Sequence, residues 1–167
     1  ASNGTSAPVW ATLDMTYVPD STFKKSCRVA TTADLAAASA TTQVLTGPVG
    51  ALGAIDGITV AYLDRVLVKN QSNTAQNGIF YVSNTGLAAT YAWTLTRSDD
   101  ANTSSRIASG IVAIDEGTVN GGKLFDNDFK TTDTIGTTAM PWSINIDAGG
   151  GVFTGSVYPT GNTLLMG

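Results

Sequence analysis

The fold is decided by residues 64–82, which read Asp64-Arg65-Val66-Leu67-Val68-Lys69-Asn70-Gln71-Ser72-Asn73-Thr74-Ala75-Gln76-Asn77-Gly78-Ile79-Phe80-Tyr81-Val82. Two β-branched and aromatic runs flank a polar segment that closes on Asn77-Gly78, a dipeptide that readily takes positive φ at a strand entry. The runs are therefore predicted to pair antiparallel at the centre of a sheet. Residues 71–76 are long for a tight turn and are expected to coil into one helical turn.

Both faces of this hairpin carry apolar residues. Val66 and Val68 share one face of the first strand, while Leu67 lies among charged residues on the other face, because strand side chains alternate. Phe80 and Tyr81 are adjacent in the second strand, so that strand also carries a large aromatic residue on each face. We expect both faces to be partly covered, as in a sandwich.

Short strands are predicted along the rest of the chain, separated by Gly, Asn and Asp turn signals, which is typical of an all-β sandwich or barrel. One helical turn is expected at 31–38, with Thr31 or Thr32 as its N-cap. The strands are predicted at 23–30, 42–46, 55–60, 91–97, 111–114, 123–125 and 137–146. The fold class is therefore all-β, an antiparallel β-sandwich or barrel-like domain with extended N- and C-terminal segments.

The chain divides into three parts. An N-terminal linker or assembly segment is expected at 1–22, the domain at 23–147, and a Gly-hinged C-terminal linker or shaft at 148–167. The apolar residues of the N-terminal segment need a cover, supplied either by the domain or by another copy of the chain, and the C-terminal segment is expected to pair with another strand edge. The candidate assembly residues are Trp10, Leu13, Val152, Phe153, Val157 and Tyr158.

Composition narrows the choice of partners. Charged residues make up 13% of the 167 residues and the net charge is −4. A chain with this balance lacks the basic stripe that nucleic acid and anionic membranes attract, so neither is an expected partner. No apolar run approaches the ~20 residues of a membrane span, so membrane insertion is not expected. The single cysteine, Cys27, is interpreted as a buried free thiol.

We find no catalytic constellation and no cofactor motif in the sequence. Histidine is absent, which removes the commonest general base and metal ligand. The pairs Asp99-Asp100 and Asp115-Glu116 are better interpreted as solvated loop charges than as glycosidase carboxylates. Asp126-Asn127-Asp128 begins like a calcium loop but lacks its later ligands. The chain is therefore not predicted to be an enzyme, and no catalytic, cofactor or metal residue is assigned.

Two side-chain groups have alternative interpretations. Four aromatic residues are either core or a sugar-stacking platform, and strand spacing favours core. They are Tyr62, Tyr91, Trp93 and Trp142. Four charged residues near the hairpin form either a buried ion-pair network or ordinary surface pairs of at most ~1 kcal/mol each. They are Asp64, Arg65, Arg97 and Arg106.

The motif spread over residues 64–71, 77–79 and 93–101 closely resembles a domain that recurs in tail-fibre and related virion fibre proteins of tailed bacteriophages. The flanking sequences at 29–35, 55–57, 115–118 and 135–142 resemble further signatures of that family, in the same order. The resemblance covers about 24–146. It is specific to the family, but the family motif supplies no catalytic or ligand residue to transfer.

The resemblance implies a structural module of a virion or extracellular fibre. Such fibres are commonly trimers that carry or position a receptor-binding tip, so the implied partners are copies of the chain, other virion or fibre proteins, and a host surface glycan. Two alternatives stay open: a self-polymerising filament subunit that exchanges terminal strands, and a carbohydrate-binding, lectin-like module.

Overall fold

A computed structural model describes residues 22–37 and 39–146 of the chain. The regular elements of the described part are almost all strands, which confirms the all-β fold class. Its elements in chain order are β1 (Val29–Ala30), β2 (Ser39–Ala40), β3 (Val44–Val49), β4 (Arg65–Val68), η1 (Thr74–Gln76), β5 (Gly78–Asn84), β6 (Ala92–Arg97), η2 (Asp99–Ala101), α1 (Ser104–Ile107), β7 (Ile111–Ala113), β8 (Leu124–Asn127) and β9 (Trp142–Ile146). The six candidate assembly residues, Trp10, Leu13, Val152, Phe153, Val157 and Tyr158, lie outside the described residues.

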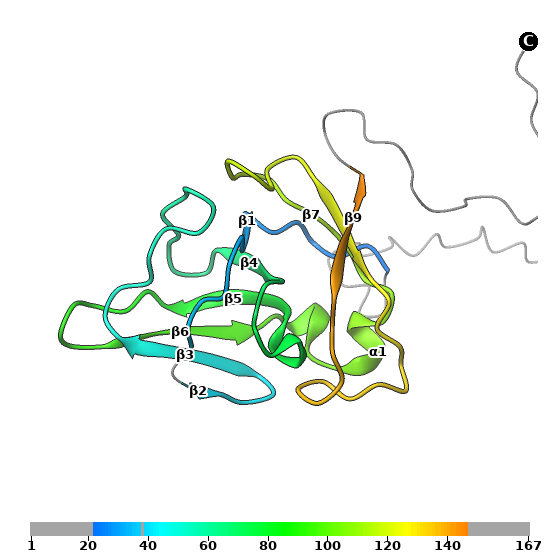
Figure 1. The fold of residues 1–167 in the computed structure, drawn as a ribbon, viewed down its shortest axis with the longest axis horizontal. Helices are drawn as coiled ribbons and strands as arrows, with labels where there is room; N and C mark the ends of the chain where they lie inside the picture. Colours follow the sequence, from blue (N-terminus) through cyan, green and yellow to red (C-terminus); the bar gives the residue numbers. More distant parts are fainter. Residues whose placement is uncertain (1–21, 38, 147–167) are drawn as a thin grey trace, which may run out of the picture.

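The strands form two sheets (Figure 1). The larger sheet has the strand order β1-β4-β5-β6-β3-β2, and the smaller has the order β7-β8-β9. The predicted central hairpin is confirmed, because β4 and β5 pair antiparallel with Val66 opposite Phe80. The larger sheet is mixed rather than wholly antiparallel, since β1 runs parallel to β4.

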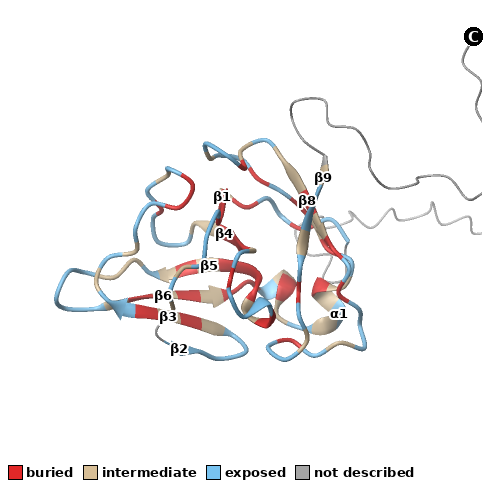
Figure 2. Cartoon of the chain, viewed as in Figure 1, coloured by how far each residue is buried: buried red, intermediate tan, exposed pale blue. Residues whose placement is uncertain are grey.

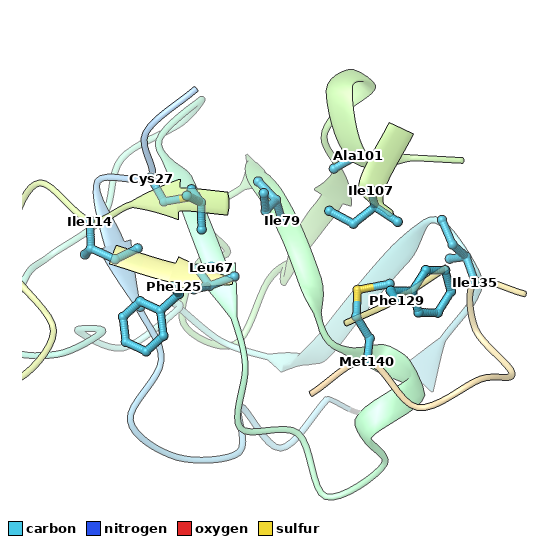
Figure 3. Close-up of a cluster of buried hydrophobic side chains, with 12 residues drawn as sticks. Cys27, Leu67, Ile79, Ala101, Ile107, Ile114, Phe125, Phe129, Ile135 and Met140 are labelled. Atoms are coloured by element: carbon cyan, nitrogen blue, oxygen red, sulfur yellow. The ribbon is translucent and has the colours of Figure 1, made fainter. Parts of the chain in front are cut away.

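Each face of the larger sheet has its own apolar core. On one face, Leu67 and Ile79 pack with residues of the smaller sheet and its loops, and we call this set the inter-sheet core. Figure 3 shows Phe129, Ile135 and Met140 at one end of it and Cys27, Ile114 and Phe125 at the other. The expected covering of both faces is therefore observed here.

The opposite face holds the second core, which we call the outer core. Its buried members are Val29, Leu45, Ile55, Val60, Val66, Val68, Phe80, Val82, Trp93 and Leu95. Leu52 and Ile58 pack against this core from the segment between β3 and β4, so that segment acts as its cover. Alternation along β6, where Trp93 and Leu95 are buried, confirms the strand predicted at 91–97 apart from its first residue.

Two predicted elements are wrong. Residues 31–37 form no helical turn. The segment bends at Thr32 and Ala33, and Ala36 takes a φ of +50°. Hydrogen bonds tie it to the loop after β4: the Leu35 amide donates to the Gln71 side chain, and the Ser72 amide donates to Asp34. The predicted strand at 55–60 is instead a tight reversal, with positive φ at Asp56 (51°) and Gly57 (81°). In it the amides and carbonyls of Ile55 and Ile58 bond to each other.

Other strand boundaries shift. The strand predicted from Phe23 is ordered as β1 only at Val29–Ala30, with isolated parallel bridges at Phe23 and Cys27 to the smaller sheet. The strand predicted from 137 begins at Trp142. The helical turn expected within 71–76 is confirmed as η1, whose N-cap Asn73 accepts from the Ala75 amide.

Candidate functional site

The end of the larger sheet where β4 finishes and β5 begins is organised around Arg97, and we call it the locked end. Arg97 is buried, and its guanidinium donates to the Thr42 and Asn77 carbonyls, both at 3.0 Å. It also lies over the Phe80 ring, 4.6 Å from the centroid. Burial lowers the pKa of Arg97 to about 10. The guanidinium is thus held by backbone carbonyls and an aromatic face.

Gly78 makes room for this guanidinium. Its φ is +148°, and a Cβ there would meet the Arg97 Nη1 atom. A glycine is required because the left-handed region and the space above the Cα are both closed to other side chains. The positive φ predicted for the Asn77-Gly78 dipeptide is therefore found at Gly78.

Asn77 ties the locked end to the loop that precedes β9. Its side-chain oxygen accepts from the Gln71 amide at 3.0 Å, and its Nδ2 donates to the Lys69 and Met140 carbonyls at 3.2 Å. The residue is completely buried. Three hydrogen bonds in the interior make this amide a structural joint.

Two arginines fix the segment before β1. Arg65 pairs with Asp100 at 3.0 Å and also donates to the Lys25 and Ser26 carbonyls. Arg28 pairs with Asp64 at 2.6 Å and with Glu116 at 3.1 Å. The hydrogen bonds that Arg28 donates, first to Glu116 and then to Asp64, raise the pKa of its guanidinium.

The four charged residues proposed as one network near the hairpin are therefore divided. Asp64 and Arg65 bind different partners, and Arg97 binds carbonyls. Arg106 donates to the Asp99 carbonyl and to the Asn102 side chain. A single network is absent from these four residues, because Asp64 and Arg65 pair with Arg28 and Asp100 instead of with one another or with the other two arginines.

The paired loop carboxylates take part in structural contacts. Asp100 binds Arg65, Asp115 accepts from the Ser26 hydroxyl at 2.8 Å, and Glu116 binds Arg28. The Asp126 carboxylate accepts from the side-chain Nδ2 of Asn145 at 3.3 Å. Within residues 22–37 and 39–146, no group of three or more His, Cys, Asp or Glu side chains is placed to hold a metal ion.

A hollow of about 130 Å³ lies beside the outer core, lined by residues 31–35 and 54–56. Its two carboxylates are already bound. Asp56 accepts from the Val119 and Asn120 amides at 2.8 and 2.7 Å. Hydrogen bonds from Ser72, and then from the Ala36 amide, lower the pKa of Asp34. These carboxylates hold loops in place.

The four aromatic residues do not form one platform. Trp93 is 4% exposed and belongs to the outer core, and Trp142 packs against the inter-sheet core. Tyr62 and Tyr91 are 65% and 60% exposed. The core interpretation is therefore right for the tryptophans and wrong for the tyrosines.

Cys27 is buried in the inter-sheet core, as expected. Burial raises the pKa of its thiol from 9.0 to about 12. The thiol is therefore protonated at neutral pH.

The opposite end of the larger sheet, where β5 finishes, exposes large apolar side chains, and we call it the apolar end. They are Val49, Tyr62, Leu63, Leu87 and Tyr91, each more than half exposed. Figure 2 shows the end of β3 and the β5–β6 connection exposed together. Large apolar side chains gathered at one end of a sheet make a candidate contact surface, because exposed apolar groups on soluble proteins often mark interaction sites.

Hydrogen bonds bring the three segments of the apolar end together. The Gly50 amide donates to the Tyr91 carbonyl at 3.0 Å, and Leu52 donates to Thr85 at 2.7 Å. The Leu63 amide donates to the Val82 carbonyl at 2.9 Å. The side chains are therefore carried on loops with a fixed backbone.

Sequence reasoning did not single out Val49, Leu63 or Leu87. The signal that finds them is charge depletion, since residues 49–63 and 84–92 contain one charged residue, Asp56. Loops are normally polar, so loops that are both uncharged and apolar point to a covered surface.

Comparison of the chain with models of protein families, with curated proteins and with solved structures finds no match. Among the described residues, no helix has the length and apolarity needed to cross a bilayer.

Proposed function

We propose that the chain is a structural module of a virion or extracellular fibre, a tail fibre or related appendage, which assembles with copies of itself. It carries or presents the part of the fibre that adheres to the host receptor, and it performs no catalysis. The resemblance of the motif to phage fibre domains supports the proposed class, and the geometry around the motif supports a structural mode of action.

The observation that carries the proposal is how the motif residues are used. Arg65, Asn77 and Arg97 are bound to neighbouring strands, loops and carbonyls. Such a motif builds a rigid framework, and the domain then acts through its surface. The apolar end is the part of that surface best suited to contact with another protein.

In a fibre, a rigid domain would hold neighbouring copies at fixed positions. The inter-sheet core and the outer core fix the larger sheet from both faces. Repeated copies would then supply affinity for a host surface through multivalency, because linked weak sites bind at a high effective concentration.

The mass of the full chain in solution tests this proposal. Light scattering or sedimentation over a wide range of protein concentrations is expected to give a multiple of the 17.1 kDa chain mass, with a trimer favoured. A protein that stays a single chain at every concentration, and that binds glycans in that state, would instead be the lectin-like module.

A further inference from the structure

We propose that the apolar end binds the apolar end of another copy of this chain. This inference rests on the proposed function and names the surface through which the copies meet. It places the contact within the described domain, where the sequence alone had located the candidate contacts in the terminal segments.

Charge is the first argument for a second copy as the occupant. Each copy carries a net charge of −4, so most contacts between copies bring like charges together. The apolar end avoids this cost, because the one charged residue in its loops, Asp56, is 8% exposed and accepts from the Val119 and Asn120 amides. The adjoining Asp64 is neutralised by Arg28.

Side-chain chemistry argues against a sugar in the same place. Sugar sites combine an aromatic face with convergent polar side chains. Here the Asn84 oxygen already accepts from the Gly86 amide at 2.8 Å, and the Thr90 hydroxyl donates to the Ala88 carbonyl at 3.2 Å. The remaining side chains of the loops are mainly Ala, Leu, Val and Tyr, which suit the uncharged core of a protein interface.

Preorganisation favours tight contact. The three segments are already fixed by the hydrogen bonds from Gly50, Leu52 and Leu63, so little backbone entropy is lost on binding. Tyr62 and Tyr91 are the anchors, because tyrosine buries a large area at small entropic cost.

The position of the patch fits an assembly contact. Thr22 accepts from the Ile111 amide, and Ile146 lies opposite Leu124, so both described ends of the domain lie at the smaller sheet. Figure 1 shows this sheet away from the β5–β6 connection. Copies joined at their apolar ends therefore keep the points of chain entry and exit uncovered.

The test compares two double variants of the full chain that add the same charge. Leu63→Asp with Leu87→Asp changes the apolar end, at side chains 58% and 55% exposed. Val119→Asp with Ile144→Asp is the control, at side chains 55% and 50% exposed elsewhere on the domain. Mass is measured by sedimentation across concentrations, and circular dichroism checks that each variant is folded.

The expected result is that wild type and control assemble alike, while the apolar-end variant associates at least tenfold more weakly. A wild type that assembles while the apolar-end variant keeps its mass overturns this inference and leaves the proposed function standing. A wild type that is a single chain at every concentration overturns both. Glycan binding that the apolar-end variant loses without any change in mass also overturns the inference.

Cross-linking keeps the test decisive if the charged variant does not fold. Leu87→Cys in a Cys27→Ala background is expected to form a disulfide between copies on mild oxidation, because Leu87 sits in the proposed contact. Val119→Cys in the same background is expected to remain reduced. Equal cross-linking of the two variants contradicts the inference.

Discussion

The two ends of the larger sheet use their polar atoms differently. At the locked end, a fully buried amide and a guanidinium bind backbone carbonyls from four segments. At the apolar end, backbone hydrogen bonds join the loops to one another and to β5, and large uncharged side chains are exposed. The difference indicates that one end stabilises the domain and the other is available to bind.

The largest effect is expected from Gly78→Ala at the locked end. The new Cβ demands an unfavourable φ and displaces the Arg97 guanidinium from the Asn77 carbonyl. We expect a loss of about 3–5 kcal/mol in the free energy of unfolding, measured by urea titration.

Gly53→Ala is the control, since a Cβ there meets no atom within 4 Å. It is expected to change stability by less than ~1 kcal/mol. Equal losses would remove the special role of the locked end.

Asn77→Ala is the next largest change. It leaves the Gln71 amide and the Lys69 and Met140 carbonyls without their side-chain partner. Unpaired buried polar groups make the expected loss about 2–3 kcal/mol by the same titration. Asn84→Ala is the matched change at the apolar end, where one local hydrogen bond to Gly86 is lost. It is expected to cost under ~1 kcal/mol, and a reversed order would contradict the comparison.

Sequence reasoning predicts the centre of the sheet well and its periphery poorly. The β4–β5 hairpin follows from alternation and from the Asn77-Gly78 dipeptide, which are local signals. The strand predicted at 55–60 fails because the Asp56-Gly57 turn signal within it prevails: both residues take positive φ, and the Asp56 carboxylate accepts from amides more than 60 residues away. Local patterns contain no record of such long-range hydrogen bonds.

The candidate site shows the same limit. Local patterns do not identify the partners of the motif arginines: Arg65 pairs with Asp100, 35 residues away, and Arg97 donates to the Thr42 carbonyl, 55 residues away. Strand spacing predicts Tyr62 and Tyr91 in the core together with Trp93. Each instead lies just outside a strand, at a position where the sheet gives no cover.

The buried thiol of Cys27 in the inter-sheet core is expected to make the stability of the domain depend on pH. Its pKa is raised from 9.0 to about 12, so the unfolded chain loses this proton first and binds fewer protons than the native state between these values. The contribution of this thiol to the free energy of unfolding is therefore fully present below pH 9. It is lost as the pH rises toward 12, by at most ~1.4 kcal/mol per pH unit.

Cys27→Ala isolates that contribution. The variant is less stable than wild type at pH 8, and its deficit is expected to shrink by about 1–2 kcal/mol at pH 10.5, because only wild type loses the buried thiol's contribution. Urea titrations of both proteins at the two pH values measure the change. A deficit that stays constant with pH would show that the thiol titrates normally in the folded protein.

The smallest effect on the isolated domain is expected from Leu63→Ser at the apolar end. Leu63 is 58% exposed, so at a protein concentration where copies are separate the stability should change by less than ~0.5 kcal/mol. Leu67→Ser, four residues along the chain in the inter-sheet core, should cost several times more because Leu67 is fully buried.

Concentration separates the two roles further. If copies meet at the apolar end, wild type gains thermal stability as the protein concentration rises, since association stabilises the folded state by mass action. Leu63→Ser should weaken that gain while leaving the midpoint in dilute solution unchanged. Leu67→Ser should lower the midpoint at every concentration and keep the dependence on concentration. Thermal melts of the three proteins over a hundredfold range of concentration distinguish a residue that stabilises the domain from one that joins its copies.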